Sequence, residues 1–255
     1  CGIFGYIGHR QNSLEIIIKG LQKLEYRGYD SWGVATVIDN KLFVKKKVGK
    51  ISKAKLEDFQ QKSTMAIGHT RWATHGEPSQ LNAHPHSDTP GKFVIVHNGI
   101  IENYYSLKTE LQKKGHNFTT QTDSEVLAHL ISELYEGDFE QAVRLALTQV
   151  RGTYGLAVLC QDEPDKLIAA RMGSPLVVGV GDNENFIASK TLLPTCFNCF
   201  RDHSVCVHPS FFWELGPALP QESVPVRCER RNDHKFFTVT MILPRQISFS
   251  PEKES

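Results

Sequence analysis

The sequence predicts an α+β fold in which antiparallel sheets carry helices on their outer faces. Apart from one helical stretch, β-branched strand patterns dominate residues 1–101. Amphipathic helical patterns then occupy residues 103–152, and strand patterns return between residues 153 and 189. Strands and helices therefore do not alternate regularly as they do in parallel βαβ sheets, which favours antiparallel sheets.

The first predicted elements are a buried strand, a helix and a hairpin. Residues 2–8 are apolar and rich in glycine, which is typical of a buried strand that other backbones approach closely. Residues 12–28 start with polar side chains, place apolar side chains on one helical face and end at glycine. The runs 32–38 and 42–48 flank Asp39-Asn40, a good tight-turn pair, and so predict a hairpin.

The rest of the first 190 residues predicts two short strands, three helices and more strands. The apolar runs 65–67 and 93–96 each lead into polar segments that carry histidines, and functional residues concentrate in loops that follow strands. One helix is predicted at 103–114, another begins at Thr122, and a third is capped by Asp138 and closed by Gly152. The later strands are predicted at 154–160, 167–171, 176–180 and 186–189.

The composition suits one large domain or two small ones and excludes several classes of partner. Lysines and arginines number 29 against 28 aspartates and glutamates, so no overall charge attracts nucleic acid or an acidic membrane. No apolar run approaches the roughly 18 residues of a membrane span and no leader pattern opens the chain, so we expect a cytoplasmic protein. The six cysteines are unevenly placed, and we expect reduced thiols.

Cys1 is the first candidate catalytic residue. Because the chain begins with cysteine rather than methionine, we expect that processing created this N-terminus. Only at position 1 does a cysteine bring its own base, since a free α-amino group titrates near ~7.7–8.0. Its ammonium form also lowers the pKa of the thiol and favours the nucleophilic thiolate. A processed chain of any kind can begin with cysteine, and a lipid-bearing cysteine is an alternative that the strand at 2–8 disfavours.

Two polar segments each allow a structural and a chemical interpretation. Asn98-Gly99 follows an apolar run and is typical of a hairpin turn; alternatively, the Asn98 amide and the Gly99 backbone N–H form an oxyanion hole. The segment 69–78 is either a surface loop with one salt bridge and a buried tryptophan, or a site in which Arg71 captures a carboxylate.

The segment 122–125 and the histidines also allow more than one interpretation. Thr122 and Glu125 have the spacing of a capping box, and Asp123 favours a helix dipole or faces the ammonium of an amino-acid substrate. Five histidines in the neighbouring segments, His69, His75, His84, His86 and His97, suggest a metal, but none has a zinc-site spacing, and we expect no metal. Gly179-Val180-Gly181 lacks the third glycine and the helix of a dinucleotide loop.

Seven ordered blocks of the sequence together resemble the class II glutamine amidotransferases, whose glutaminase domains are N-terminal-nucleophile hydrolases. The blocks are CGI at 1–3, LEYRGYDS at 24–31, GHTRWATHGEPS at 68–79, NAHPH at 82–86, VHNGIIEN at 96–103, TDSE at 122–125 and GSPLVVGVG at 173–181. The TRWATHG block is most similar to the glutamine–fructose-6-phosphate aminotransferase branch, rather than to amidophosphoribosyltransferases or asparagine synthetases.

The resemblance implies a four-layer αββα sandwich with two antiparallel sheets, and hydrolysis of L-glutamine to glutamate and ammonia through a thioester, without a metal or organic cofactor. The roles it implies are Cys1 as nucleophile and base, Asn98 and Gly99 as oxyanion hole, Arg71 for the substrate carboxylate, Asp123 for its ammonium, Trp72, Thr74 and His75 around the pocket, and Arg27 as support for the nucleophile. In this family the ammonia passes to a C-terminal sugar-phosphate isomerase half, which we expect as a partner missing from this chain.

The chain departs from the family pattern in two places. Trp32 stands where the family has a small residue, so its indole either crowds the pocket or fills a gap in the core. The resemblance covers residues 1–190, and residues 191–255 form a divergent tail that we expect to be a replacement that does not complete the second sheet. Its Cys196 and Cys199 are half a zinc site at most.

These departures leave two other functions open. One is a regulatory or degenerate domain that binds glutamine without turnover. The other is an N-terminal-nucleophile amidase for a different amide, which would accept substrates without a free α-carboxylate.

Overall fold

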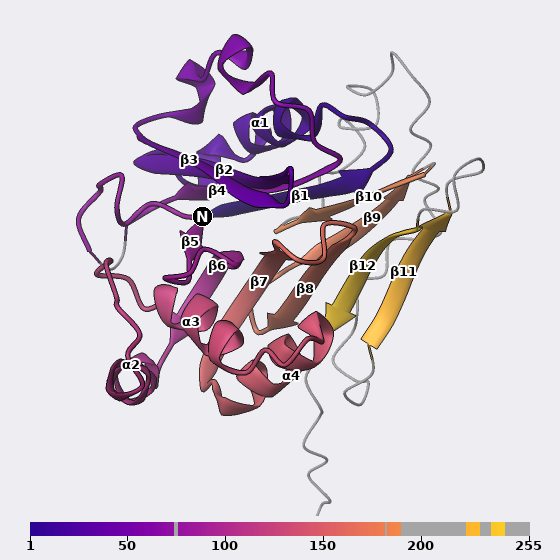
Figure 1. Ribbon diagram of the computed structural model, residues 1–255. Coiled ribbons are helices and arrows are strands. Elements are labelled where there is room, and N and C mark those ends of the chain that lie inside the picture. Colours follow the sequence, from indigo (N-terminus) through magenta and orange to yellow (C-terminus); the bar gives the residue numbers. More distant parts are fainter. Residues whose placement is uncertain (74–75, 182, 190–222, 230–235, 243–255) are drawn as a thin grey trace, which may run out of the picture.

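The computed structural model describes residues 1–73, 76–181, 183–189, 223–229 and 236–242. In these residues two sheets face each other, and helices cover the outer face of each sheet (Figure 1). The predicted α+β class and the four-layer αββα sandwich are thereby confirmed.

The first sheet has the strand order β3-β2-β4-β1-β10-β9, and all of its neighbours are antiparallel. Its central strand, β1, begins one residue after Cys1, so the N-terminus lies at one end of this sheet. The strands are β1 (Gly2–Gly8), β2 (Ser31–Ile38), β3 (Lys41–Val48), β4 (Met65–Arg71), β9 (Val177–Gly181) and β10 (Glu184–Ala188).

The second sheet has the strand order β11-β12-β8-β7-β6-β5. Its neighbours are antiparallel except β12 and β8, which are parallel. The strands are β5 (His86–Ser87), β6 (Phe93–Ile101), β7 (Gly152–Cys160), β8 (Lys166–Met172), β11 (Ser223–Glu229) and β12 (Phe236–Ile242).

Four helices cover the sheets: α1 (Ser13–Lys23), α2 (Tyr104–Lys113), α3 (Glu125–Glu133) and α4 (Phe139–Gln149). Helix α1 packs on the first sheet, and Gly68 of β4 permits the contact because a Cβ there would lie 2.5 Å from Ile17. The three other helices lie on the outer face of the second sheet (Figure 1). Asp138 caps α4 as predicted, since its carboxylate accepts the backbone N–H of Gln141 at 3.0 Å.

Three apolar clusters separate the four layers. One joins α1 to the first sheet, one fills the space between the sheets, and one joins the second sheet to α2, α3 and α4. Trp32 lies in the α1 cluster, 2% exposed, with its ring 6.0 Å from that of Phe59. This position agrees with the alternative in which the indole fills a gap in the core.

Three local interpretations do not agree with the structure. Of the two alternatives for Asn98 and Gly99, the hairpin turn does not occur, because these residues continue β6 and pair with Gly155 and Tyr154 of β7. The capping box is also wrong: Ser124 precedes α3 without a side-chain cap, and Glu125 binds the preceding loop instead. Residues 223–229 and 236–242 of the tail extend the second sheet through β8, although we expected the tail to stay outside it.

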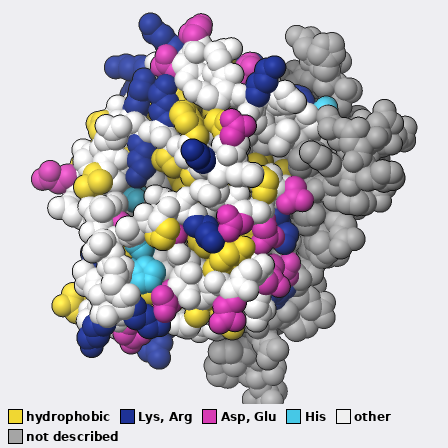
Figure 2. Space-filling view, viewed as in Figure 1, with side chains coloured by type: hydrophobic (Ala, Val, Ile, Leu, Met, Phe, Trp, Pro, Cys, Tyr) yellow, Lys and Arg dark blue, Asp and Glu magenta, His cyan; other side chains and the backbone are white. Residues whose placement is uncertain are grey.

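Several features of the surface bear on partners. No helix among the described residues is long and apolar enough to cross a membrane. Basic and acidic side chains both occur across the face seen in Figure 2, in keeping with the net charge of +1. The tail residues Cys196 and Cys199 lie outside the described residues.

Candidate active site

The N-terminal cysteine is held by contacts on both sides of its backbone. Its α-amino group donates to the Arg27 carbonyl oxygen at 2.5 Å, and the Arg27 Nε–H donates to the Cys1 carbonyl oxygen at 2.8 Å. Its sulfur lies 3.4 Å from the backbone nitrogen of Trp72, which donates to it. The structure thus brings together the end of β4, the start of β1 and the turn that follows α1.

Burial changes the protonation of the Cys1 amine. It lowers the pKa of this amine from 8.0 to about 6, with a further lowering by the nearby Arg27 charge and an opposing effect from Asp30. Most molecules therefore carry a neutral, proton-accepting amine at neutral pH. The Cys1 sulfur contacts the Trp72 backbone, so the amine and the thiol lie together at the partly exposed start of β1.

Asn98 faces the cysteine from the second sheet. Its side-chain Nδ2 donates to the Cys1 carbonyl oxygen at 3.4 Å, and its Oδ1 lies 2.9 Å from Nε2 of His69. Gly99 follows with φ of +133°, and a Cβ there would overlap the Thr153 carbonyl oxygen. Only glycine fits this position, and the Asn98 amide is directed at Cys1.

Arg71 and Asp123 are two charged groups that lie close enough for the charge of Asp123 to act on Arg71. Arg71 is 4% exposed, and its guanidinium donates to the Gly76 and Glu77 carbonyl oxygens at 3.0 and 3.3 Å. Burial lowers the pKa of Arg71, whereas the charges of Asp30 and Asp123 raise it. The Asp123 carboxylate accepts the backbone N–H of Ile101 at 2.7 Å, which ties it to the end of β6.

Trp72 is the exposed member of the site. Its side chain is 52% exposed and meets Tyr29 edge-on, with ring centroids 5.1 Å apart. Gly28 allows this approach of the two segments, because a Cβ there would lie 2.6 Å from the Arg71 carbonyl carbon. Thr74 and His75, which we also predicted at the pocket, lie outside the described residues.

Two residues that position the site, Asp30 and Asn82, stand in the sequence blocks without a predicted role of their own. Asp30 accepts the backbone N–H of Ala73 and so holds the segment that follows Trp72. Asn82 binds Gln121 through two hydrogen bonds of 3.0 Å, from Nδ2 to the Gln121 Oε1 and from the Gln121 backbone N–H to Oδ1. These partners lie 39 residues apart, a separation at which local patterns predict no contact.

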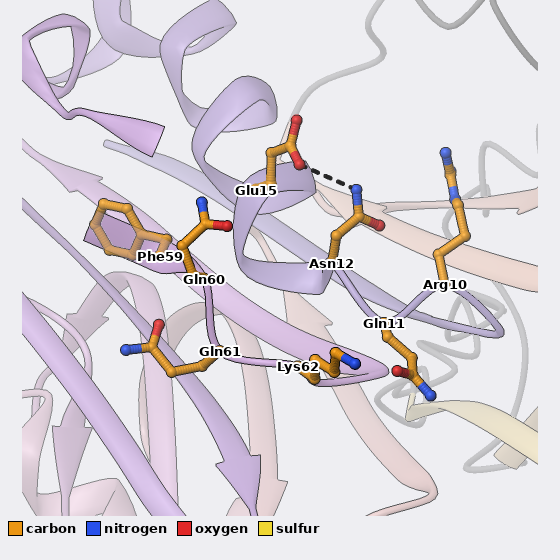
Figure 3. Close-up of a pocket in the computed structure, with 8 residues that line it drawn as sticks. All are labelled: Arg10, Gln11, Asn12, Glu15, Phe59, Gln60, Gln61 and Lys62. Carbon is orange, nitrogen blue, oxygen red and sulfur yellow. Dashed lines mark hydrogen bonds between the residues drawn. The ribbon is translucent and has the colours of Figure 1, made fainter. Parts of the chain in front are cut away.

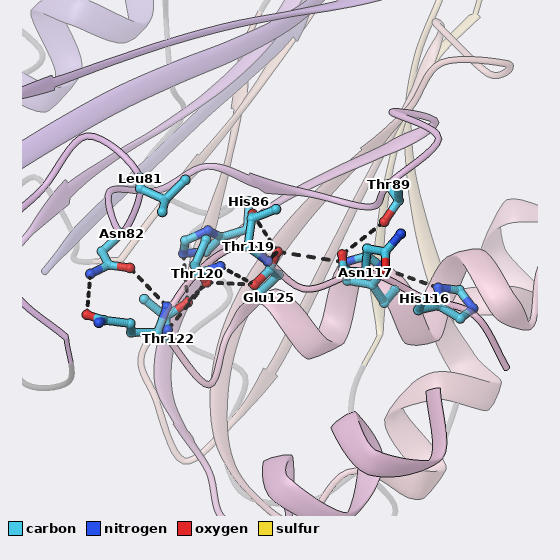
Figure 4. Close-up of polar contacts among 12 residues, drawn as sticks. Leu81, Asn82, His86, Thr89, His116, Asn117, Thr119, Thr120, Thr122 and Glu125 are labelled. Atoms are coloured by element: carbon cyan, nitrogen blue, oxygen red, sulfur yellow. Dashed lines mark hydrogen bonds and ion pairs between the residues drawn. The ribbon is translucent and has the colours of Figure 1, made fainter. Parts of the chain in front are cut away.

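Glu125 organises the loop that precedes Asp123. Its carboxylate accepts the backbone N–H groups and hydroxyls of Thr119 and Thr120 at 2.8 to 3.0 Å (Figure 4). Burial raises the pKa of Glu125, but the neighbouring His129, whose Nε2 lies 3.8 Å from the carboxylate, and the hydrogen bonds from these two threonines outweigh it and hold the pKa well below its usual range. A buried, ionised glutamate thereby fixes the path of the chain into α3.

The buried histidines do not form a metal site in the described part of the chain. His69, His84 and His86 pack ring against ring, with centroids 4.2 and 4.3 Å apart. Burial holds the pKa of each of the three well below its ordinary value. Among the described residues, no three His, Cys, Asp or Glu side chains converge on a possible metal position.

A separate pocket of about 400 Å³ lies at the other end of β1 (Figure 3). It is lined mainly by polar side chains, among them Asn12, Glu15 and Lys62, and shares none of the residues around Cys1. Arg10 at its rim is engaged by Glu184 through two hydrogen bonds of 2.8 Å. The pocket therefore presents no nucleophile and base of the kind found at Cys1.

The fold and the N-terminal cysteine together define a class of protein, and comparison with known proteins agrees. Residues 69–193 match the family of glutamine amidotransferase domains. The chain therefore contains a glutamine amidotransferase domain, and the solved structures that it resembles are amidotransferases of the same fold.

Within this family the similar curated relatives are glutamine–fructose-6-phosphate aminotransferases (isomerizing). The one from Symbiobacterium thermophilum is 52% identical over 198 residues, which cover 76% of this chain and 32% of the relative. The one from Thermococcus kodakarensis is 54% identical over 193 residues, which cover 74% and 32%. The chain thus spans about a third of the length of the curated relatives it matches.

Two solved structures resemble the fold. Glutamine phosphoribosylpyrophosphate amidotransferase from B. subtilis, complexed with ADP and GMP, superposes with a TM-score of 0.63 at 29% identity and covers 75% of this chain and 42% of its own. A structure described as the allosteric regulatory enzyme of purine biosynthesis gives a TM-score of 0.66 at the same identity and coverage.

Proposed function

We propose that this chain hydrolyses the side-chain amide of L-glutamine to glutamate and ammonia, with Cys1 as nucleophile. The observation that carries the proposal is the convergence on Cys1 of a neutral amine and the Asn98 amide. The amine supplies a base within the same residue, and the amide supplies a hydrogen-bond donor from the opposite sheet. Acyl transfer needs both groups next to the nucleophile.

The reaction begins when the Cys1 thiol gives its proton to its own amine. The thiolate attacks the amide carbon of glutamine, and the carbonyl oxygen becomes negatively charged. Asn98 Nδ2 and the Gly99 N–H donate to this oxygen. The ammonium of Cys1 then protonates the leaving nitrogen, ammonia departs, and a thioester remains. Water, deprotonated by the same amine, attacks the thioester and releases glutamate and the free thiol.

Arg71 and Asp123 account for selectivity toward an α-amino acid. In this proposal Arg71 binds the α-carboxylate of glutamine and Asp123 binds its α-ammonium, because charge-assisted hydrogen bonds of this type are strong and geometrically specific. Thr74, His75 and the exposed indole of Trp72 complete the pocket, and Arg27 supports Cys1 through its two contacts with that residue.

We also propose that fructose 6-phosphate accepts the ammonia in the whole protein. The support is the name shared by the curated relatives and the match to about a third of their length. A sugar-phosphate isomerase part would then be the partner of this domain in the cytoplasm. The reaction catalysed by the described residues needs no metal or organic cofactor in this scheme.

Glutamate release by the purified chain tests the proposal. We expect glutamate release by the wild type and none by Cys1→Ala. A glutamine analogue that alkylates thiols should modify Cys1 covalently. Intact mass must first show an unblocked N-terminus. Equal rates for the wild type and Cys1→Ala would refute the role of Cys1. Glutamine binding without release would indicate a binding domain, and turnover of amides without an α-carboxylate would indicate another amidase.

A further inference from the structure

The hydrogen bond between His69 and Asn98 links the buried core to the nucleophile. His69 lies in β4 and is completely buried, and its Nε2 is 2.9 Å from Oδ1 of Asn98. An amide oxygen only accepts hydrogen bonds, so Nε2 must carry the proton. The contact therefore selects one tautomer of the imidazole.

This tautomer decides which end of the Asn98 amide faces Cys1. With Oδ1 held by His69, the planar amide directs Nδ2 to the Cys1 carbonyl oxygen, 3.4 Å away. A flipped amide would place its oxygen against that carbonyl oxygen and offer no donor to a developing oxyanion. A His69 with its proton on Nδ1 would favour this flipped state, since its bare Nε2 would accept a hydrogen bond from the amide NH₂.

The surroundings of His69 keep the imidazole in place. Its ring packs on that of His84, with centroids 4.2 Å apart, and His84 packs in turn on His86. Its Nδ1 has no hydrogen-bond partner among the described residues, so no competing contact pulls the proton to that side. Burial lowers the pKa of His69 to about 3, so the ring stays neutral over the working range.

We propose that His69 is a positioning residue that donates its Nε2 proton to Asn98 and thereby keeps the Asn98 NH₂ directed at the oxyanion. This inference rests on the proposed glutaminase function. It predicts an effect on kcat with little effect on KM. The groups proposed to bind the α-amino acid are held by other contacts, Arg71 by the Gly76 carbonyl oxygen and Asp123 by the Ile101 N–H.

Three substitutions separate the donor from the space that the ring fills. In His69→Gln the side-chain NH₂ replaces the Nε2 donor, in His69→Asn the amide reaches only the Nδ1 position, and in His69→Phe the ring remains without a donor. We expect kcat to fall about 10- to 100-fold in the Asn and Phe variants, less than the ~10²- to 10³-fold cost of losing an oxyanion donor. The Gln variant should recover most of the rate.

The matched control is His84→Phe, which alters the same ring stack without touching Asn98. Its kcat should stay near the wild-type value. In an Asn98→Ala background, His69→Phe should cost less than threefold, since the donor it positions is gone. Equal losses in both backgrounds, or no rescue by His69→Gln, would overturn the proposal.

A spectroscopic test does not depend on activity or on a variant that folds. The ¹⁵N chemical shifts of the imidazole in the wild-type chain distinguish the Nε2–H tautomer from the Nδ1–H tautomer. We expect His69 as the Nε2–H form. Finding the Nδ1–H form would refute the positioning role, whereas failure of Cys1-dependent glutamate release with the expected tautomer would refute the proposed function instead.

Discussion

At the scale of single residues, the chemistry depends on the environment of Cys1. A thiol and an amine exist in any N-terminal cysteine, but a free amine with an ordinary pKa near 8.0 would be mostly protonated at neutral pH. Burial and the charge of Arg27 shift the pKa of this amine to about 6. The fold thus converts a weakly populated base into the dominant form.

The pH dependence of glutamine hydrolysis should show this shift. The neutral amine is the active form, so kcat/KM should rise with pH through an acid limb near pH 6 rather than near 8.0. Arg27→Gln removes a charge that lowers the pKa and should move the limb to higher pH. Lys53→Gln, which removes an exposed charge elsewhere, should leave the limb in place. Profiles of kcat/KM between pH 5 and 9 give the position of the acid limb for each variant. An acid limb at the same pH in Arg27→Gln and the wild type would contradict the prediction.

Substrate selectivity can be tested at Asp123. Asp123→Asn keeps an oxygen that accepts the Ile101 N–H but removes the negative charge. We expect KM for glutamine to rise about 10- to 100-fold, which corresponds to the roughly 1.5–3 kcal/mol of a hydrogen bond to a charged group. A glutamine analogue without the α-amino group should show no such change between the wild type and the variant. An equal rise in KM for both substrates would contradict the assignment of Asp123 to the ammonium.

The sequence singles out the candidate chemical groups of the site but not the residues that support them. Cys1, Arg71, Asn98 and Asp123 stand in recognisable blocks, and the structure brings them to one end of the sheets. Asn82 also stands in such a block, but its role could not be predicted. Its partner Gln121 lies in another loop, outside all of the blocks. Contacts of this kind depend on tertiary packing rather than on local pattern.

At the scale of elements, two loops must be held together for the charged groups to face one substrate. Asn82 is 3% exposed, and besides its two bonds to Gln121 it donates to the Glu77 carbonyl oxygen at 3.1 Å. That same carbonyl accepts from Arg71. Asn82 therefore connects the loop contacted by Arg71 to the loop that leads into Asp123.

Removing this connection should affect binding more than the chemical step. We expect Asn82→Ala to raise KM for glutamine several-fold, because Arg71 and Asp123 lose their common support, while kcat changes little. Asp138→Ala is a matched control, since loss of its helix cap should cost about 1 kcal/mol of stability without changing KM. Steady-state kinetics and urea unfolding of both variants provide the test. Equal KM values for Asn82→Ala and the wild type would contradict it.

Local sequence patterns predicted most helices and strands. They failed where residues distant in the sequence determine the conformation. Asp39 and Asn40 form the predicted turn, with φ of 49° and 55°. Asn98-Gly99 is an equally good turn pair, yet it continues a strand because β7, more than 50 residues later, pairs with it. Glu125 has capping-box spacing but binds Thr119 and Thr120, which approach it from the preceding loop. In each failure a tertiary contact outweighs a local preference.

At the scale of the whole molecule, the active site exists only while the two sheets are packed together. Cys1 begins the first sheet, whereas Asn98 belongs to the second. The apolar cluster between the sheets packs the two sheets against each other. It includes Ile3, Ile67, Val96 and Leu159. Activity and global stability should therefore depend on the same apolar core.

Leu159→Ala tests this dependence, because Leu159 is completely buried between the sheets in β7. The lost side chain leaves a cavity, and we expect unfolding free energy to fall by about 2–5 kcal/mol. Leu145→Ala removes the same atoms from a side chain that is 40% exposed on α4, and it should cost less than about 1 kcal/mol. Urea titrations followed by tryptophan fluorescence measure both values.

The same titrations, followed by residual glutaminase activity, show whether the sheets separate as one unit. Because the proposed nucleophile and the proposed oxyanion donor come from different sheets, activity and fluorescence should be lost with one midpoint in the wild type. Both midpoints should shift together in Leu159→Ala. Loss of activity at clearly lower urea than the fluorescence change would mean that the sheets part before either unfolds. In that case the cluster between them would not be the element that holds the site together.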